Sequence, residues 1–196
     1  MSIVMKTLKN SKFDEKQFIS NLVNIEKLSD EFVIEMKYAT EDNFTRKKVY
    51  PISLCVMQLG TARKLIKANE EFLKMGLRIK IWDAYRPLSV QKLMYDIVPN
   101  DDFVANPYNG GSIHNSGFAV DITLVDMNGE EIEMPSGFDD FSEKASRKNT
   151  AMNEVAAKNL SILTDVMIKN GFVTIDSEWW HYCDEDFKER IALNIP

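Results

Sequence analysis

The chain has 196 residues, a formal net charge of −6, 44% apolar residues and 28% charged residues. This size suits one ordinary domain with a sizeable core, so we expect a single domain over 1–196, with residues 1–30 as an N-terminal extension or helix. An acidic chain without a basic block predicts no nucleic-acid partner. No apolar run approaches the roughly 18 residues that cross a bilayer, and no signal peptide is recognisable, so we expect a cytoplasmic protein without a membrane partner.

Hydrophobic periodicity predicts strands and helices that alternate irregularly along the chain. In chain order we expect a strand over 32–38, helices over 57–75 and 87–98 with a strand over 77–81 between them, a strand over 118–124, a helix over 151–170 and a strand over 171–176. A turn-rich segment over 99–111 joins the two halves, and a short amphipathic helix is expected over 184–191. Because regular βαβ spacing is missing, the predicted fold is α+β, with a mostly antiparallel central sheet flanked by helices.

The sequence contains only two histidines, and the first, His114, lies seven residues before Asp121. In one unbroken strand these two side chains would point to opposite faces, so the turn formers of 115–117 are needed to bring them together. Asp121 interrupts an apolar strand, where an unpaired carboxylate is costly to bury. A metal ion is one partner that would offset this cost. A solvated strand face is the alternative.

The second histidine, His181, follows Glu178 and two tryptophans. His114, Asp121 and His181 together supply the three protein ligands that a catalytic zinc ion takes, and Glu178 can stand behind them as a base. The alternative for this segment is an aromatic core with a hydrogen-bonded histidine. Cys55 and Cys183 carry no Cys-x-x-Cys pattern, and we interpret them as ordinary thiols.

A third polar group follows the strand predicted over 77–81, where Arg86 precedes a proline. An arginine at such a strand–helix junction can project over a cleft and offer fixed charge to a carboxylate or to an oxyanion. A surface arginine paired with Asp83 is the alternative.

Four motifs in this order resemble the VanX-type zinc D-alanyl-D-alanine dipeptidases, part of a wider group of zinc D-Ala-D-Ala carboxypeptidases and cell-wall endopeptidases. They are Lys37-Tyr38-Ala39-Thr40-x-Asp42-Asn43-Phe44, Tyr85-Arg86-Pro87, Ser112-x-His114-x-x-Gly117-x-Ala119-x-Asp121 and Glu178-Trp179-Trp180-His181. The last two mark the wider group, and the first narrows it to the dipeptidases. The resemblance extends from about residue 30 to residue 185.

The resemblance implies one zinc ion per chain and hydrolysis of the small dipeptide D-Ala-D-Ala to two D-alanines. By motif, the implied zinc ligands are His114, Asp121 and His181, the catalytic base is Glu178, the transition-state stabiliser is Arg86, and the substrate contacts are Ser112, Asp139 and Tyr38. The chain departs from the family pattern at 115–116 and 135–137. These departures affect the expected substrate contacts and leave the metal-ligand motif intact.

Other functions remain open at this point. A D,D-carboxypeptidase or a peptidoglycan endopeptidase would act on longer cell-wall peptides, and a non-catalytic zinc-binding module would be expected to lack the base or the arginine. Glu178 and Arg86 are both present. The sequence does not fix the oligomeric state or the physiological role.

Overall fold

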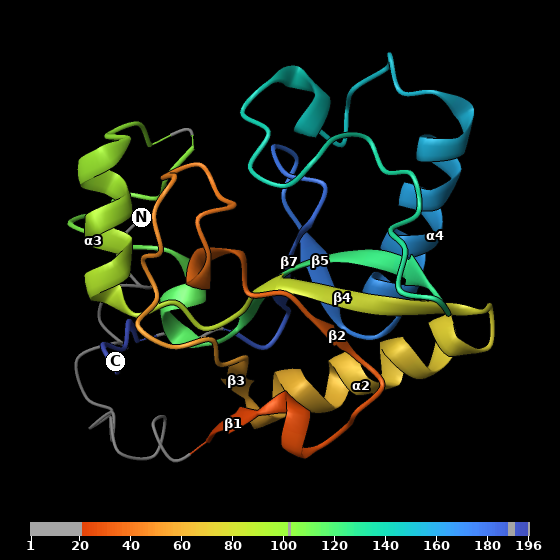
Figure 1. Cartoon of the computed structure of the whole chain (residues 1–196), viewed down its shortest axis with the longest axis horizontal. Coiled ribbons are helices and arrows are strands. Elements are labelled where there is room, and N and C mark those ends of the chain that lie inside the picture. Colours follow the sequence, from red (N-terminus) through yellow and green to blue (C-terminus); the bar gives the residue numbers. More distant parts are fainter. Residues whose placement is uncertain (1–20, 102, 188–190, 196) are drawn as a thin grey trace, which may run out of the picture.

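The computed structural model describes residues 21–101, 103–187 and 191–195, so most of the expected N-terminal extension lies outside the described residues. Figure 1 shows the arrangement of the elements. The strands are β1 (Leu22–Asn24), β2 (Val33–Ile34), β3 (Val56–Gln58), β4 (Leu77–Asp83), β5 (Ala119–Asp126), β6 (Phe172–Thr174) and β7 (His181–Asp184). The α-helices are α2 (Leu59–Leu73), α3 (Leu88–Ile97) and α4 (Glu154–Lys169), and the 3₁₀ turns are η2 (Ile25–Lys27), η3 (Lys37–Ala39), η4 (Ile113–Ser116) and η5 (Glu143–Ala145).

A five-stranded sheet with the order β2-β4-β5-β7-β6 forms the centre of the protein. Only the edge strand β2 runs parallel to its neighbour β4, and the remaining pairs are antiparallel. A separate two-stranded sheet joins β1 to β3. The prediction of an α+β fold with a mostly antiparallel sheet is therefore confirmed.

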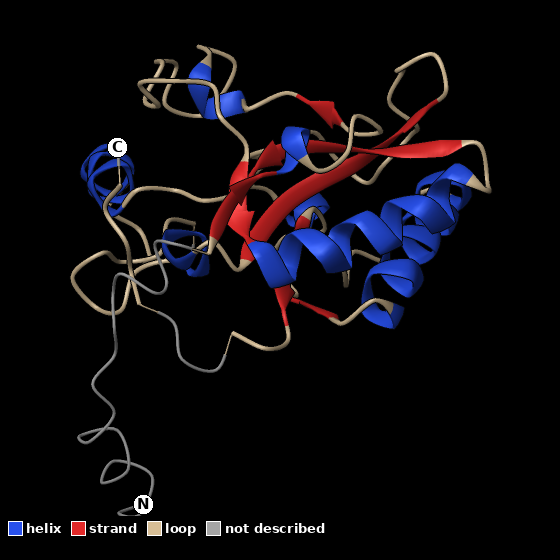
Figure 2. Cartoon of the chain, turned by 90° about the horizontal axis from the view of Figure 1, so that it is seen from below, coloured by secondary structure: helices blue, strands red, loops and turns tan. Residues whose placement is uncertain are grey.

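The hydrophobic core lies between this sheet and the helices α2 and α4, which Figure 2 shows on the same side of the sheet. Ile79 and Ile81 of β4 and Ile122 and Leu124 of β5 are fully buried. Because side chains alternate along a strand, the residues between them point to the opposite side. Asp121, which precedes Ile122, is therefore directed to the side of the sheet away from the helices.

The structure changes the bounds of several predicted elements. The strand expected over 32–38 is reduced to β2, and the chain then turns through η3, which contains Tyr38. The strands β1, β3 and β7 were not predicted, because each has at most four residues and is defined by its pairing partner.

The helix expected over 184–191 is wrong where the structure describes it, because Asp184 ends strand β7 and a turn follows. Asp184 is buried and accepts hydrogen bonds from Thr61 (2.8 Å) and from Lys64 (2.6 Å) of α2. These contacts fix the end of β7 against α2. None of the helices in the described residues has both the length and the apolar character needed to cross a bilayer.

Candidate active site

One pocket brings together all of the residues that the sequence singled out for chemistry. Its cavity volume is about 210 Å³, below the about 300–1,000 Å³ of pockets that hold drug-sized ligands. The lining includes Tyr38, Arg86, Ser112, His114, Asp121, Asp139, Glu178 and His181. A pocket of this size, lined by both acidic and basic groups, suits a small charged ligand.

His114 reaches the pocket from the turn η4, immediately before strand β5. Gly117 ends this turn in the left-handed region, with φ of 76°. A Cβ at this position would lie 2.7 Å from Leu22, so both the conformation and the space favour glycine. This turn sends the chain into β5 and places His114 on the same side as Asp121, as the spacing required.

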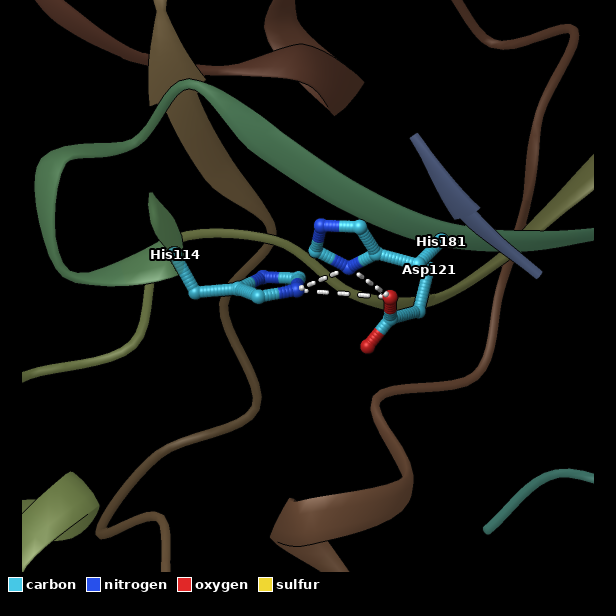
Figure 3. A group of neighbouring side chains, drawn as sticks. All are labelled: His114, Asp121 and His181. Carbon is cyan, nitrogen blue, oxygen red and sulfur yellow. Dashed lines mark hydrogen bonds and ion pairs between the residues drawn. The ribbon is translucent and has the colours of Figure 1, made fainter. Parts of the chain in front are cut away.

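Asp121 and His181 are direct neighbours on the antiparallel strands β5 and β7. His181 Nδ1 lies 2.9 Å from Asp121 Oδ1, and His114 Nε2 lies 3.1 Å from His181 Nδ1 and 3.3 Å from Asp121 Oδ1 (Figure 3). Ligand atoms placed tetrahedrally around zinc at its usual bond lengths are separated by about 3.3 Å. The three donor atoms thus have the composition and spacing of one face of a zinc tetrahedron, and the residues fit a metal ion.

The outer nitrogen of each imidazole has a partner that fixes the orientation of the ring. His114 Nδ1 lies 2.7 Å from the carbonyl oxygen of Ala84, which can only accept, so Nδ1 carries the proton and Nε2 is left free toward the pocket. His181 Nε2 lies 3.1 Å from Cys183 Sγ. Because residues two apart on a strand share a face, β7 places this thiol behind the ring. Such outer contacts orient metal-binding histidines.

The electrostatics of the three residues favour a cation. Burial alone would raise the pKa of Asp121, but its interactions with His114 and His181 hold that pKa well below its usual range. For His181, burial alone would lower the pKa, but the hydrogen bond to Asp121 raises that pKa well above its ordinary value. A metal ion would take the place of the bound protons.

Glu178 lines the pocket beside this group, with its Oε2 3.9 Å from His181 Nδ1. Burial raises the pKa of Glu178 above its ordinary value, and the nearby Asp121 adds to the rise. A carboxylate with a raised pKa at the edge of a metal-binding site is suited to accept and return a proton.

Arg86 is buried beside the candidate metal-binding group, which consists of His114, Asp121 and His181, and it is not a surface residue. Asp83 holds it through hydrogen bonds from Nε (3.0 Å) and Nη2 (2.6 Å), and Gln91 accepts from Nη1 at 2.9 Å. Burial would lower the pKa of Arg86, but Asp83 and the surrounding groups raise it well above the ordinary value. The pairing with Asp83 thus exists, and it positions a fixed positive charge whose Nη2 lies 3.9 Å from Asp121 Oδ2.

Asp139 forms another part of the pocket wall. Its Oδ1 accepts from the hydroxyl of Tyr38 at 2.8 Å, and its Oδ2 accepts from the backbone N–H of Phe44 at 3.2 Å. Burial raises the pKa of the carboxyl to about 7. Asp139 also has a positive φ of 57°. Strained backbone and an unpaired acid of this kind are typical of functional positions.

Ser112 caps the turn η4, with its Oγ accepting from the backbone N–H of His114 at 3.3 Å. Asn115, one of the positions where the chain departs from the family pattern, holds the same region together. Its Oδ1 accepts from Ser112 N at 2.8 Å, and its Nδ2 donates to the carbonyl of Arg86 at 2.8 Å. Asn115 therefore fixes the loops of Arg86, Ser112 and His114 relative to each other.

The pocket is also lined by two aromatic residues that no sequence pattern indicated, Phe103 and Phe141. Both lie in loops without a periodic pattern, and neither belongs to a motif. Their contribution arises from the way separate loops meet in space, which no local signal in the sequence reveals.

Comparisons with known proteins identify the family of this chain. The family model described as D-ala-D-ala dipeptidase matches residues 19–193, and the chain belongs to this family. The chain is therefore an enzyme of the zinc metallopeptidase class. It is 33% identical to the D-alanyl-D-alanine dipeptidase of Escherichia coli (strain K12), over 83% of this chain and 84% of that protein. It is 30% identical to the D-alanyl-D-alanine dipeptidase of Enterococcus faecium, over 78% and 85%.

Solved structures show a more distant similarity. A vancomycin-resistance D,D-pentapeptidase, VanY, in complex with Zn(II), superimposes with a TM-score of 0.45 at 14% identity, over 71% of this chain and 78% of that chain. An LD-carboxypeptidase, LdcB, gives a TM-score of 0.46 at 21% identity, over 67% and 61%.

Proposed function

We propose that the protein is a zinc-dependent dipeptidase that hydrolyses D-Ala-D-Ala to two D-alanines. The observation that supports this proposal is that three potential metal ligand atoms lie within 3.3 Å of each other. They share one pocket of about 210 Å³ with Glu178, Arg86 and Asp139. Membership of the family and two relatives named D-alanyl-D-alanine dipeptidase support the substrate.

In this proposal His114 Nε2, Asp121 Oδ1 and His181 Nδ1 hold one zinc ion. When bound, zinc would lower the pKa of water and polarise the scissile carbonyl. Glu178 takes the proton of the attacking water and returns it to the leaving amine, which its raised pKa favours. Arg86, held by Asp83, faces the negative charge that develops on the carbonyl oxygen.

The remaining polar groups of the pocket bind the two ends of the dipeptide. Asp139 is a pocket-facing carboxylate that accepts hydrogen bonds from two neutral donors, the hydroxyl of Tyr38 and the backbone N–H of Phe44. It pairs with the substrate ammonium, and Tyr38 holds the carboxyl in place. Ser112 contacts the substrate carboxylate or the reacting carbonyl. A free dipeptide satisfies both ends at once. The D,D-carboxypeptidase alternative would need room for a longer peptide, and the small pocket disfavours it.

The test is the steady-state kinetics of zinc-loaded protein with D-Ala-D-Ala, L-Ala-L-Ala and a longer peptide that ends in D-Ala. We expect preference for D-Ala-D-Ala. Faster cleavage of the longer peptide would refute the dipeptidase proposal in favour of the carboxypeptidase.

The proposed role of Glu178 is tested by Glu178→Gln, which keeps the size of the side chain. A base contributes about 10²–10⁴-fold to rate, so we expect a loss of at least about 100-fold in kcat with an unchanged zinc content. Glu130→Gln, at an exposed position outside the pocket, is the control. Full turnover in Glu178→Gln would show that another group is the base.

A further inference from the structure

Three phenylalanines from different loops meet along one edge of the pocket, and we call them the aromatic row: Phe44, Phe103 and Phe141. The rings of Phe103 and Phe141 are stacked, with centroids 4.7 Å apart and an angle of 29° between their planes. Phe44 contacts Phe141 with centroids 5.3 Å apart. All three line the pocket. The row is thus a continuous aromatic wall along one edge of the pocket.

Phe103 and Phe141 are not needed to complete the hydrophobic core. Phe103 is 39% exposed and Phe141 is 36% exposed, and neither belongs to the core cluster of the described residues. Loops that carry large apolar side chains at a pocket, without a packing role, are common sites of binding function.

Backbone hydrogen bonds anchor the loops that carry the two rings. The backbone N–H groups of Phe103 and Val104 donate to the carbonyl of Asn100 at 3.1 and 2.9 Å. Val104 is buried and anchors this loop beside the pocket. The loop of Phe141 is held at the following turn, where the backbone N–H of Trp179 donates to the carbonyl of Ala145 at 3.0 Å.

The aromatic row borders the part of the pocket that contains Asp139. The backbone N–H of Phe44 donates to Asp139 Oδ2, and Phe141 follows Asp139 by two residues. If Asp139 pairs with the substrate ammonium, as the proposed function holds, the row borders the space that a peptide extended at its amino end would enter.

We propose that the Phe103–Phe141 stack closes the amino end of the pocket and sets the length of peptide that the enzyme accepts. This inference rests on the proposed function and assigns its length limit to two particular side chains. A second cavity of about 40 Å³ lies against the same two rings and also borders Glu178 and Trp180. Removal of either ring would join the two cavities and make room for a further residue.

The test compares D-Ala-D-Ala with the tripeptide L-Lys-D-Ala-D-Ala in Phe103→Ala and Phe141→Ala. We expect the ratio of kcat/KM for the tripeptide to that for the dipeptide to rise at least ~10-fold in each variant, the lower end of discrimination by apolar pocket contacts. The tripeptide lacks the dipeptide's ammonium at Asp139 in every variant, so this difference cancels from the comparison. Phe103→Leu and Phe141→Leu, which remove the ring with less loss of volume, should give smaller rises and guard against misfolding.

Tyr108→Ala is the matched control. Tyr108 lies in the same loop as Phe103 and is 69% exposed, but it packs on Tyr95 and does not line the pocket. We expect its ratio to stay within about twofold of the wild type, because the site remains closed.

A binding measurement, which needs no turnover, distinguishes failure of this proposal from failure of the proposed function. Binding of both peptides is measured by calorimetry in zinc-loaded protein that carries Glu178→Gln, with and without each phenylalanine substitution. If the wild type hydrolyses the dipeptide but all four variants keep the wild-type selectivity and binding of the tripeptide, this proposal alone is overturned. If the wild type fails to hydrolyse the dipeptide, the proposed function fails. Improved tripeptide binding in the alanine variants would still support the closure by the stack, and unchanged binding would refute it.

Discussion

Replacement of Asp139 by asparagine should stabilise the protein at neutral and alkaline pH while it weakens dipeptide binding. Asparagine has nearly the same shape and tolerates the left-handed backbone that Asp139 adopts with φ of 57°. Its amide can keep both existing contacts, because the hydroxyl of Tyr38 can either donate or accept. The substitution therefore removes the charge with little change in packing.

The size of the effect follows from the raised pKa of the carboxyl. A rise from 3.8 in the unfolded chain to about 7 in the folded protein corresponds to an upper limit of about 4 kcal/mol at 1.36 kcal/mol per pKa unit. Asp139 is only partly buried, so screening by solvent reduces this, and we expect about 1–3 kcal/mol. Between pH 3.8 and about 7 the folded protein binds more protons than the unfolded chain, so ionisation destabilises the wild type as the pH rises.

The assay is urea-induced unfolding of the wild type and Asp139→Asn at pH 5 and pH 8. The free energy of unfolding of the wild type should fall relative to the variant between these values. At pH 8 dipeptide affinity should drop roughly 10- to 150-fold, the equivalent of one charged hydrogen bond. A stability difference between the two proteins that does not change with pH would refute the reasoning about the buried carboxyl. Unchanged affinity would refute the pairing with the substrate ammonium.

Three further predictions concern the metal-binding group and Arg86. Asp121→Ala should abolish zinc binding, since it removes one of three donor atoms, and equilibrium dialysis with zinc checks this; retention of a full equivalent would contradict the ligand assignment. Cys183→Val should weaken zinc binding about 10–100-fold, because it removes the hydrogen-bond acceptor behind His181. Cys183→Ser should retain most of the zinc affinity, as measured by competition with a chelator. Equal affinity in both variants would show that the Cys183 thiol does not orient His181. Asp83→Asn should destabilise the fold by about 3–5 kcal/mol and lower kcat, because Arg86 loses its buried counter-charge. Chemical denaturation at pH 7 and steady-state kinetics test this, and an unchanged kcat would show that Asp83 does not position Arg86.

The sequence predicted the helices and the longer strands well because each carries its own periodic signal. Helix α4, expected over 151–170, is found over Glu154–Lys169, and strand β4, expected over 77–81, extends to Asp83. The short strand β7 was not found, although it carries His181. Its four residues have no measurable period, and its pairing with β5 defines it.

The candidate metal-binding group of His114, Asp121 and His181 could be picked out from the sequence because histidine is rare in this chain. The chain has two histidines, so a metal site with two histidine ligands can use only His114 and His181. Asp121, seven residues after the first, and Glu178, three residues before the second, supply the acidic groups. Gly117 also marked the turn that brings His114 and Asp121 to one side.

Only the tertiary structure decided the environment of these residues. It showed that Arg86 is buried against Asp83, that Cys183 lies behind His181, and that Phe103 and Phe141 meet at the edge of the pocket. The physical reason is that a ligand motif depends on residue type and local spacing, which the chain states directly. Burial, pKa and the closure of a pocket depend on which distant segments pack together, and that is settled by the folding of the whole chain.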